Sequence, residues 1–112
     1  LGEDELITAI TFPVADACAY AKYPNPASRY AMAGVFVAKT ADGIRVAVTG
    51  AGQDGVFRHE GLEAVLSGSF SADAVAGVAI DDGNLLSDIH GSAAYRANLI
   101  TVMAKRAVAA CG

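Results

Sequence analysis

The sequence contains no tryptophan, and only 7% of its residues are aromatic. Basic side chains are also few, since 8 lysine and arginine residues stand against 12 aspartate and glutamate residues, which gives a formal net charge of −4 at pH 7. This balance lacks the basic surface that neutralises nucleic-acid phosphates, so we expect no nucleic-acid partner. No apolar run approaches the roughly 18 residues of a membrane-spanning helix, so we expect no transmembrane segment.

Cysteine is scarce as well, with only Cys18 and Cys111 along the chain. Two distant cysteines form neither a disulfide framework nor the paired spacing of a zinc site. No basic stretch followed by an apolar one marks a secretory signal. These features favour a reducing compartment, and we expect a cytoplasmic protein.

Apolar residues make up 54% of the 112 residues, and many of them are alanine. A chain of this length fits one ordinary domain, which buries roughly two-thirds of the surface of its unfolded state. We therefore expect residues 1–112 to form a single domain. The chain opens with Leu1-Gly2-Glu3-Asp4 and no methionine, so we expect a processed protein or a piece of a longer one.

The first part of the sequence predicts β-structure. Apolar and β-branched residues alternate over Glu5–Phe12, and Pro13 follows, so we expect a first strand there. Ala17–Tyr23 is a weaker strand candidate, and the prolines after it end regular structure.

The best-marked element is a β-hairpin. Asp42-Gly43 separates two β-rich runs, Tyr30–Thr40 and Ile44–Thr49, and this dipeptide is a strong turn signal. The first run is apolar on both faces, as expected of a covered strand. The second run alternates, with Arg45 on the face opposite Ile44, Val46 and Val48. Val56–Arg58 further on is predicted as a short strand or as the entry to a helix.

Three helices are expected after the hairpin: His59–Ser67, a short helix from Ser71 through Ile80, and a long helix over Ala93–Ala110. Gly68 stops the first helix, and Ser71 and Ser92 can cap the other two. The apolar stripe of the last helix is predicted to comprise Tyr95, Leu99, Val102, Met103 and Ala109. Strands that lead and helices that follow are typical of an α+β fold.

Gly50, Gly52 and Gly55 form the pattern GxGxxG directly after a predicted strand. Val75–Ile80 resembles a second strand ending at Asp81, as in a dinucleotide-binding unit, where amides at a helix start hold a pyrophosphate. Here, however, the preceding strand pairs with an upstream hairpin arm, and the stretch after the second glycine resembles a turn. A glycine-rich turn is therefore favoured, and a small nucleotide-binding module is the alternative.

The two histidines, His59 and His90, do not have the spacing of a metal-binding pair. Asp88 next to His90 is a candidate acid/base or metal pair, but a solvated or capping role before the last helix is the favoured interpretation. No Gly-x-Ser-x-Gly motif and no cysteine–histidine pair indicates a nucleophile.

One dense group of polar and aromatic residues surrounds the proline-rich loop: Tyr20, Lys22, Tyr23, Asn25, Ser28, Arg29 and Tyr30. Tyrosine and arginine are common anchors at ligand and protein interfaces. A loop that covers the sheet, with its tyrosine hydroxyls in water, explains the same residues equally well. Residue chemistry leaves these two interpretations open.

Four ordered stretches match a known family, namely Gly2–Pro13, Tyr20–Ala33, Ile44–Gly52 and Ser87–Arg106. The most specific parts are Asn25–Ala31 (NPASRYA) and the spaced residues Asp88, Ser92, Tyr95 and Arg96. On these motifs the sequence resembles the C-terminal domain of the FAD-binding medium subunit of molybdenum hydroxylases. The resemblance is strongest to the aerobic carbon monoxide dehydrogenase type and spans nearly the whole chain.

The resemblance implies an antiparallel sheet of three to four strands packed against about three helices. It implies that residues 1–112 are the C-terminal domain of a longer subunit that contains N-terminal FAD-binding domains. The other implied partners are a large subunit with a molybdenum cofactor and a small subunit whose iron–sulfur clusters deliver electrons to FAD. We expect FAD in the full subunit, none in this fragment alone, and no independent activity.

The resemblance also indicates cofactor-binding residues. Tyr20 matches the family's aromatic position at the isoalloxazine ring, so it is expected to flank the flavin. Lys22 is the second cofactor-binding candidate, and some relatives place a lysine near the flavin one position away. An aromatic face shields a flavin from water and helps to set its potential. No catalytic residue and no metal ligand is implied in this chain, and the Gly50–Gly55 stretch is expected to hold no dinucleotide.

Overall fold

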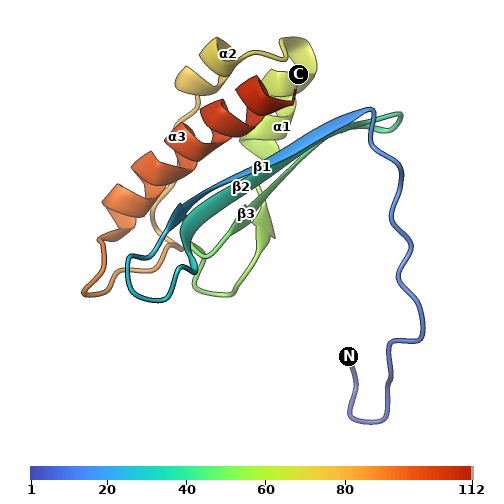
Figure 1. The fold of residues 1–112 in the computed structure, drawn as a ribbon, viewed down its shortest axis with the longest axis horizontal. Coiled ribbons are helices and arrows are strands. Elements are labelled where there is room, and N and C mark those ends of the chain that lie inside the picture. Colours follow the sequence, from blue (N-terminus) through green and yellow to red (C-terminus); the bar gives the residue numbers. More distant parts are fainter. Residues whose placement is uncertain (112) are drawn as a thin grey trace.

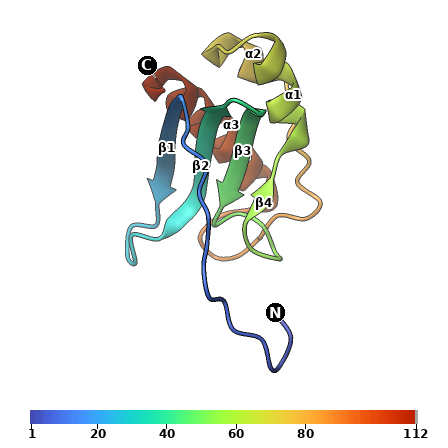
Figure 2. The same cartoon turned by 90° about the vertical axis from the view of Figure 1, so that its right-hand side faces the viewer.

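The computed structural model describes residues 1–111, which form a four-stranded antiparallel sheet with helices on one face (Figures 1 and 2). The strands follow one another in sheet order: β1 (Ala17–Pro24), β2 (Ala31–Thr40), β3 (Gly43–Thr49) and β4 (Phe57–Arg58). The helices are α1 (Glu60–Gly68), α2 (Ala72–Ala76) and α3 (Ala93–Ala110). The predicted α+β class, with its strand and helix numbers, is confirmed.

The predicted hairpin forms β2 and β3. Gly43 closes the turn with φ of 115°, a conformation that side chains with a Cβ rarely adopt. The Thr40 hydroxyl accepts a hydrogen bond from the Asp42 N–H and donates one to the Gly43 carbonyl, which fixes the turn. The weaker candidate Ala17–Tyr23 is confirmed as β1, which pairs with β2 along its length.

The core lies between the sheet and the helices. Side chains alternate between the two faces of a strand, and Val35, Val37, Val46 and Val48 fill the inner face, where none of them is exposed. Helix α3 covers β1 and β2, whereas α1 covers β3. Ala104 and Ala107 in α3 are fully buried, and their small side chains let the helix approach the sheet closely. The alanine-rich composition therefore suits this core.

The buried stripe of α3 differs from the prediction at several positions. Leu99 and Met103 are buried as expected, but Tyr95 and Ala109 are exposed and Val102 is only half-buried. The buried face instead includes Arg96, Ala97, Ile100, Ala104, Ala107 and Val108. Arg96, whose polar bonds are described below, is buried, and the neighbouring Tyr95 is exposed.

The predicted strand Glu5–Phe12 is wrong, because this stretch is extended but pairs with no strand among the described residues. Residues 1–16, the N-terminal segment, leave the start of β1 and lie away from the rest of the domain (Figures 1 and 2). An alternating pattern shows that a segment suits a sheet, but only a neighbouring edge provides its hydrogen bonds. No such edge is placed beside this segment here.

The short helix α2 also differs from the sequence pattern. The short helix begins after Ser71 as predicted, since the Ser71 hydroxyl accepts from the Ala74 N–H, but it ends at Ala76 instead of Ile80. Gly77 is its C-cap, and a glycine there weakens helix continuation.

None of the helices in residues 1–111 has the length and apolar character needed to cross a membrane.

Candidate functional site

The sheet has an outer face that none of the helices in residues 1–111 covers (Figure 2). From strand register and side-chain alternation, the outer face comprises Cys18, Tyr20 and Lys22 on β1, Gly34, Phe36 and Ala38 on β2, and Arg45, Ala47 and Thr49 on β3. The face thus carries two aromatic rings together with three basic side chains, counting Arg58 on β4 beside it. The two residues expected to bind a cofactor, Tyr20 and Lys22, both lie on the outer face.

Tyr20 is held across the sheet. Its hydroxyl forms a hydrogen bond of 2.9 Å with the Thr49 hydroxyl on β3, so the ring spans the intervening strand β2. The strand passes beneath the ring at Gly34, where a Cβ would overlap both the Tyr20 hydroxyl and the Thr49 Oγ1. The ring remains 48% exposed. This arrangement presents a fixed aromatic surface on an otherwise open face.

Lys22 is fixed by the loop that joins β1 to β2. Its Nζ donates a hydrogen bond of 3.1 Å to the Arg29 carbonyl. The loop itself is organised by Asn25, a buried side chain whose Oδ1 accepts from the N–H groups of Ala27 and Ser28. The ammonium group therefore has a defined position near one end of the outer face.

The dense polar and aromatic group around this loop divides between two sides of the molecule. Tyr20 and Lys22 lie on the outer face, and Asn25 is buried within the loop. Tyr23 instead packs edge-on against Tyr95 of α3, with ring centroids 6.5 Å apart. The two tyrosines help to line a hollow of about 270 Å³ that also contains His90. The sequence cluster is therefore not one site.

The glycine-rich stretch is a turn between antiparallel strands. Gly50 has φ of 75°, and a Cβ there would overlap the Ala31 carbonyl of β2. The chain then continues into β4, and α1 begins only at Glu60. No helix start follows Gly52, so the amide cradle of a dinucleotide site is absent from this stretch. The turn is the interpretation that the structure favours.

Arg96 forms a buried clamp that sequence reasoning did not assign. Its guanidinium donates two 3.0 Å bonds to the Asp88 carboxylate and further bonds to the carbonyls of Met32 (2.7 Å) and Gly50 (3.4 Å). The His90 N–H also donates to Asp88, and together with Arg96 it holds the pKa of this carboxyl below its usual value. Asp88 thus fastens the loop before α3 and is not paired with the His90 ring as an acid/base couple.

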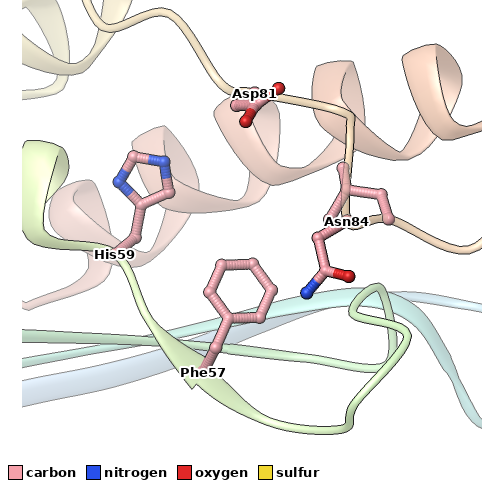
Figure 3. A pocket seen from close by; sticks show the side chains of 5 residues that line it. Phe57, His59, Asp81 and Asn84 are labelled. Carbon is pink, nitrogen blue, oxygen red and sulfur yellow. The ribbon is translucent and has the colours of Figure 1, made fainter.

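His59 lies at the start of α1, where its Nδ1 accepts from the Leu62 N–H at 3.2 Å and caps the helix. It lines a pocket of about 240 Å³ whose floor is Phe57 (Figure 3). Asp81 and Asn84 approach this pocket from the opposite loop (Figure 3). Within the part of the chain that the structure describes, no three histidine, cysteine, aspartate or glutamate side chains gather as metal ligands.

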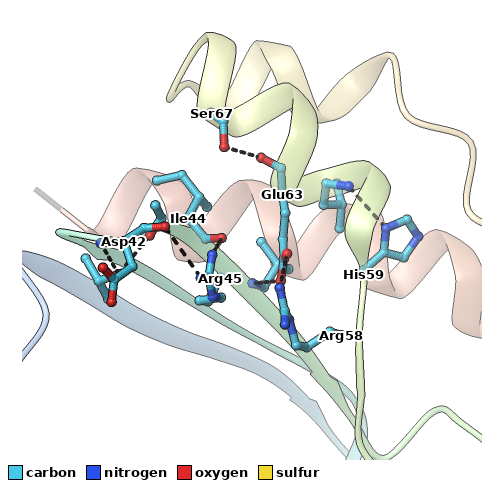
Figure 4. Close-up of polar contacts among 11 residues, drawn as sticks. Asp42, Ile44, Arg45, Arg58, His59, Glu63 and Ser67 are labelled. Atoms are coloured by element: carbon cyan, nitrogen blue, oxygen red, sulfur yellow. Dashed lines mark hydrogen bonds and ion pairs between the residues drawn. The ribbon is translucent and has the colours of Figure 1, made fainter. Parts of the chain in front are cut away.

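Glu63 of α1 joins that helix to the sheet edge (Figure 4). Its Oε1 accepts from the Val46 N–H at 3.0 Å and from Arg58 Nε at 2.9 Å, and its Oε2 accepts from the second Arg58 nitrogen at 2.6 Å. The pKa of Glu63 is lowered, chiefly by the Arg58 hydrogen bonds and also by the Val46 amide. The charged form is therefore the one that the fold stabilises.

We expect Glu63→Gln to lower stability at pH 7, with a smaller effect in acid. A carboxyl whose folded pKa is depressed stabilises the fold above its unfolded pKa of about 4.3, and this contribution is lost as pH falls through the folded pKa. Urea unfolding at pH 7 and at pH 3 measures the change. Glu60→Gln, an exposed neighbour in the first turn of α1, is the control. An equal deficit of Glu63→Gln at both pH values would contradict the expectation.

The family model described as CO dehydrogenase flavoprotein C-terminal domain matches residues 19–111. The chain belongs to this family. The match begins at Ala19 within β1 and includes β2, β3, β4, helices α1, α2 and α3, and both outer-face residues Tyr20 and Lys22. A comparison with curated proteins finds no significant match.

Among solved structures, the chain is similar to a chain of the reconstituted CO dehydrogenase from Oligotropha carboxidovorans. The identity is 25% and the TM-score is 0.66. The similarity covers 85% of this chain and only 36% of that one. The shared fold is therefore that of one part of a considerably longer protein.

Proposed function

We propose that this chain is the C-terminal domain of the flavoprotein subunit of a carbon monoxide dehydrogenase-type molybdenum hydroxylase, with its outer face against the FAD. The observation that carries the proposal is the fixed, half-exposed ring of Tyr20, which spans Gly34 and is bonded to Thr49. Membership of the CO dehydrogenase flavoprotein C-terminal domain family supports a flavin as the cofactor. The Gly50–Gly55 turn offers no support for a separate nucleotide-binding function.

The residues present suit a flavin. Aromatic rings pack favourably in offset or edge-on geometry, and the exposed surface of the Tyr20 ring is available for such packing. Lys22, two residues along the same face, places a positive charge near Tyr20. Positive charge near a flavin tunes its electronic properties. FAD, when bound, supplies the electron-accepting chemistry, which no side chain of this domain can provide.

The roles proposed for this chain are therefore binding and shielding. Tyr20 excludes water from one side of the cofactor, and Lys22, fixed by the Arg29 carbonyl, contributes a stable charge. The proposal assigns the chain no catalytic residue. Its partners would be the N-terminal FAD-binding domains of the same subunit, a molybdenum-containing large subunit and an iron–sulfur small subunit. The free thiols of Cys18 and Cys111 are consistent with a cytoplasmic location.

Tyr20→Ala in the complete flavoprotein subunit is expected to weaken FAD binding from a few-fold to about tenfold, as loss of an aromatic pair costs about 0.5–1.5 kcal/mol. Tyr20→Phe keeps the ring but loses the Thr49 bond, so we expect a smaller change. Tyr30→Ala removes an exposed tyrosine from the neighbouring loop and is the control. FAD titration and flavin absorbance measure the effect. If Tyr20→Ala is folded but keeps the affinity and spectrum of the parent, the flavin role of Tyr20 is wrong.

A further inference from the structure

Within the N-terminal segment, Glu5–Phe12 has the alternating side chains of a β-strand but no partner strand among the described residues. Among the described residues, no hydrogen bond involves the backbone of residues 6–15, although bonds are present just outside, at Glu5 and at Asp16. The stretch is extended, and its large apolar side chains are uncovered. Leu6 is 84%, Ile10 66% and Phe12 80% exposed, and all three belong to the same face of the extended chain.

These properties define the kind of surface that would cover the segment. A lone extended segment leaves its N–H and C=O groups unpaired, and an open sheet edge satisfies them. The three apolar residues on one face require a hydrophobic layer beneath that sheet. The alternate face is less apolar, with Ala9, Thr11 and one large residue, Ile7, which is 58% exposed. The receiving surface is thus a sheet edge with an apolar core on one side. The acidic residues Glu3, Asp4 and Glu5 favour basic side chains beside it.

The position of the segment points to its partner. It descends from the start of β1 on the side of the sheet that the helices leave open (Figures 1 and 2). A protein that captured the segment would therefore stand opposite the outer face, where Tyr20 lies. The family match begins only at residue 19, so the segment lies outside the matched domain. Only 36% of the similar CO dehydrogenase chain is matched, so the remainder of that chain is long enough to form a neighbouring domain.

We infer that residues 5–12 pair as a strand with an open sheet edge of the FAD-carrying neighbour, and that this pairing holds the neighbour against the outer face. The inference rests on the proposed function for the identity of that neighbour. Leu6, Ile10 and Phe12 then enter the neighbour's core, and residues 13–16 are the crossing between the two units. The domain's own edge strand β1 is a competing acceptor, and a second copy of the chain is another.

Hydrogen exchange followed by mass spectrometry tests the pairing. In the complete flavoprotein subunit, the amides of residues 6–12 are expected to exchange at least tenfold more slowly than in the 112-residue chain alone. Ile10→Asp should remove this protection and lower FAD retention. Val14→Asp, a change at an even more exposed residue beyond Pro13, should leave both unchanged.

Three other outcomes would overturn the inference, and a fourth separates it from the proposed function. Free exchange of residues 6–12 in the complete subunit would show that no strand forms there. Protection in the isolated chain that grows with its concentration would identify a second copy as the partner, and protection independent of concentration would identify β1. Slow exchange in the complete subunit combined with a silent Tyr20→Ala would keep the strand pairing and reject the flavin role.

Discussion

Arg96→Met is expected to destabilise the domain by about 3 kcal/mol, at the lower end of the range for breaking a buried ion pair. Arg96 is only 4% exposed, and its guanidinium bonds to Asp88 and to the carbonyls of Met32 and Gly50. Methionine fills much of the same volume but donates nothing, so both carbonyls lose this partner, and the one of Met32 is buried. Urea unfolding at pH 7 measures the loss, provided that circular dichroism shows a folded variant.

Asp88→Asn removes the ion pair with Arg96 but leaves the bonds from Arg96 to the two carbonyls. Asparagine keeps an oxygen that can accept from Arg96, and the Asp88 side chain is 42% exposed, so the guanidinium stays bonded to both carbonyls. We therefore expect a smaller loss than for Arg96→Met, and one that shrinks in acid because the pKa of Asp88 is lowered in the fold. A larger loss for Asp88→Asn than for Arg96→Met would show that the carboxylate, not the carbonyl bonds, carries the stability.

Gly50→Ala is expected to cost about 3 kcal/mol or more. Gly50 combines a left-handed conformation, with φ of 75°, with a position where a Cβ would overlap the carbonyl of Ala31. The overlapped atom belongs to the backbone of β2, which cannot move aside without loss of its pairing. The end of the hairpin would have to shift, and thermal unfolding is expected to report a lower midpoint.

Gly55→Ala is the matched control within the same GxGxxG pattern. Gly55 also has a positive φ, of 100°, but a Cβ there would meet no atom within 4 Å. Backbone strain alone predicts a loss of about 1–3 kcal/mol. The excess cost at Gly50 therefore measures the contact with β2. Equal losses at the two glycines would reject that contact, and improved binding of a dinucleotide to the parent chain relative to both variants would restore the alternative function.

Local signals predicted most of the fold. Asp42-Gly43 marked the central hairpin and Ser92 marked the start of α3, because a turn or a cap depends on residues only a few positions apart. Glu5–Phe12 carries an equally good local pattern, yet it forms no strand here. A strand depends on a partner, and the alternation of side chains does not say whether that partner belongs to the same domain.

The candidate site was less accessible from the sequence. The family resemblance identified Tyr20 and Lys22 as candidates, but it did not indicate Thr49 or Gly34, which fix the Tyr20 ring from 29 and 14 residues away along the chain. The role of Arg96 was missed for the same reason, because its bond to the Met32 carbonyl joins residues 64 positions apart. Contacts of this kind follow from the register of strands and helices, which no local pattern records.

The order of the elements has a consequence for synthesis. All four strands precede the helices in the chain, and α3, which covers β1 and β2, comes after every other element. A ribosome that adds about 5–20 residues per second therefore exposes the valine-lined inner face for several seconds before its cover exists. During that interval the exposed face of the nascent sheet can aggregate, and chaperones that prevent aggregation can bind it. The time needed to synthesise α3 therefore sets how long the nascent domain is prone to aggregation.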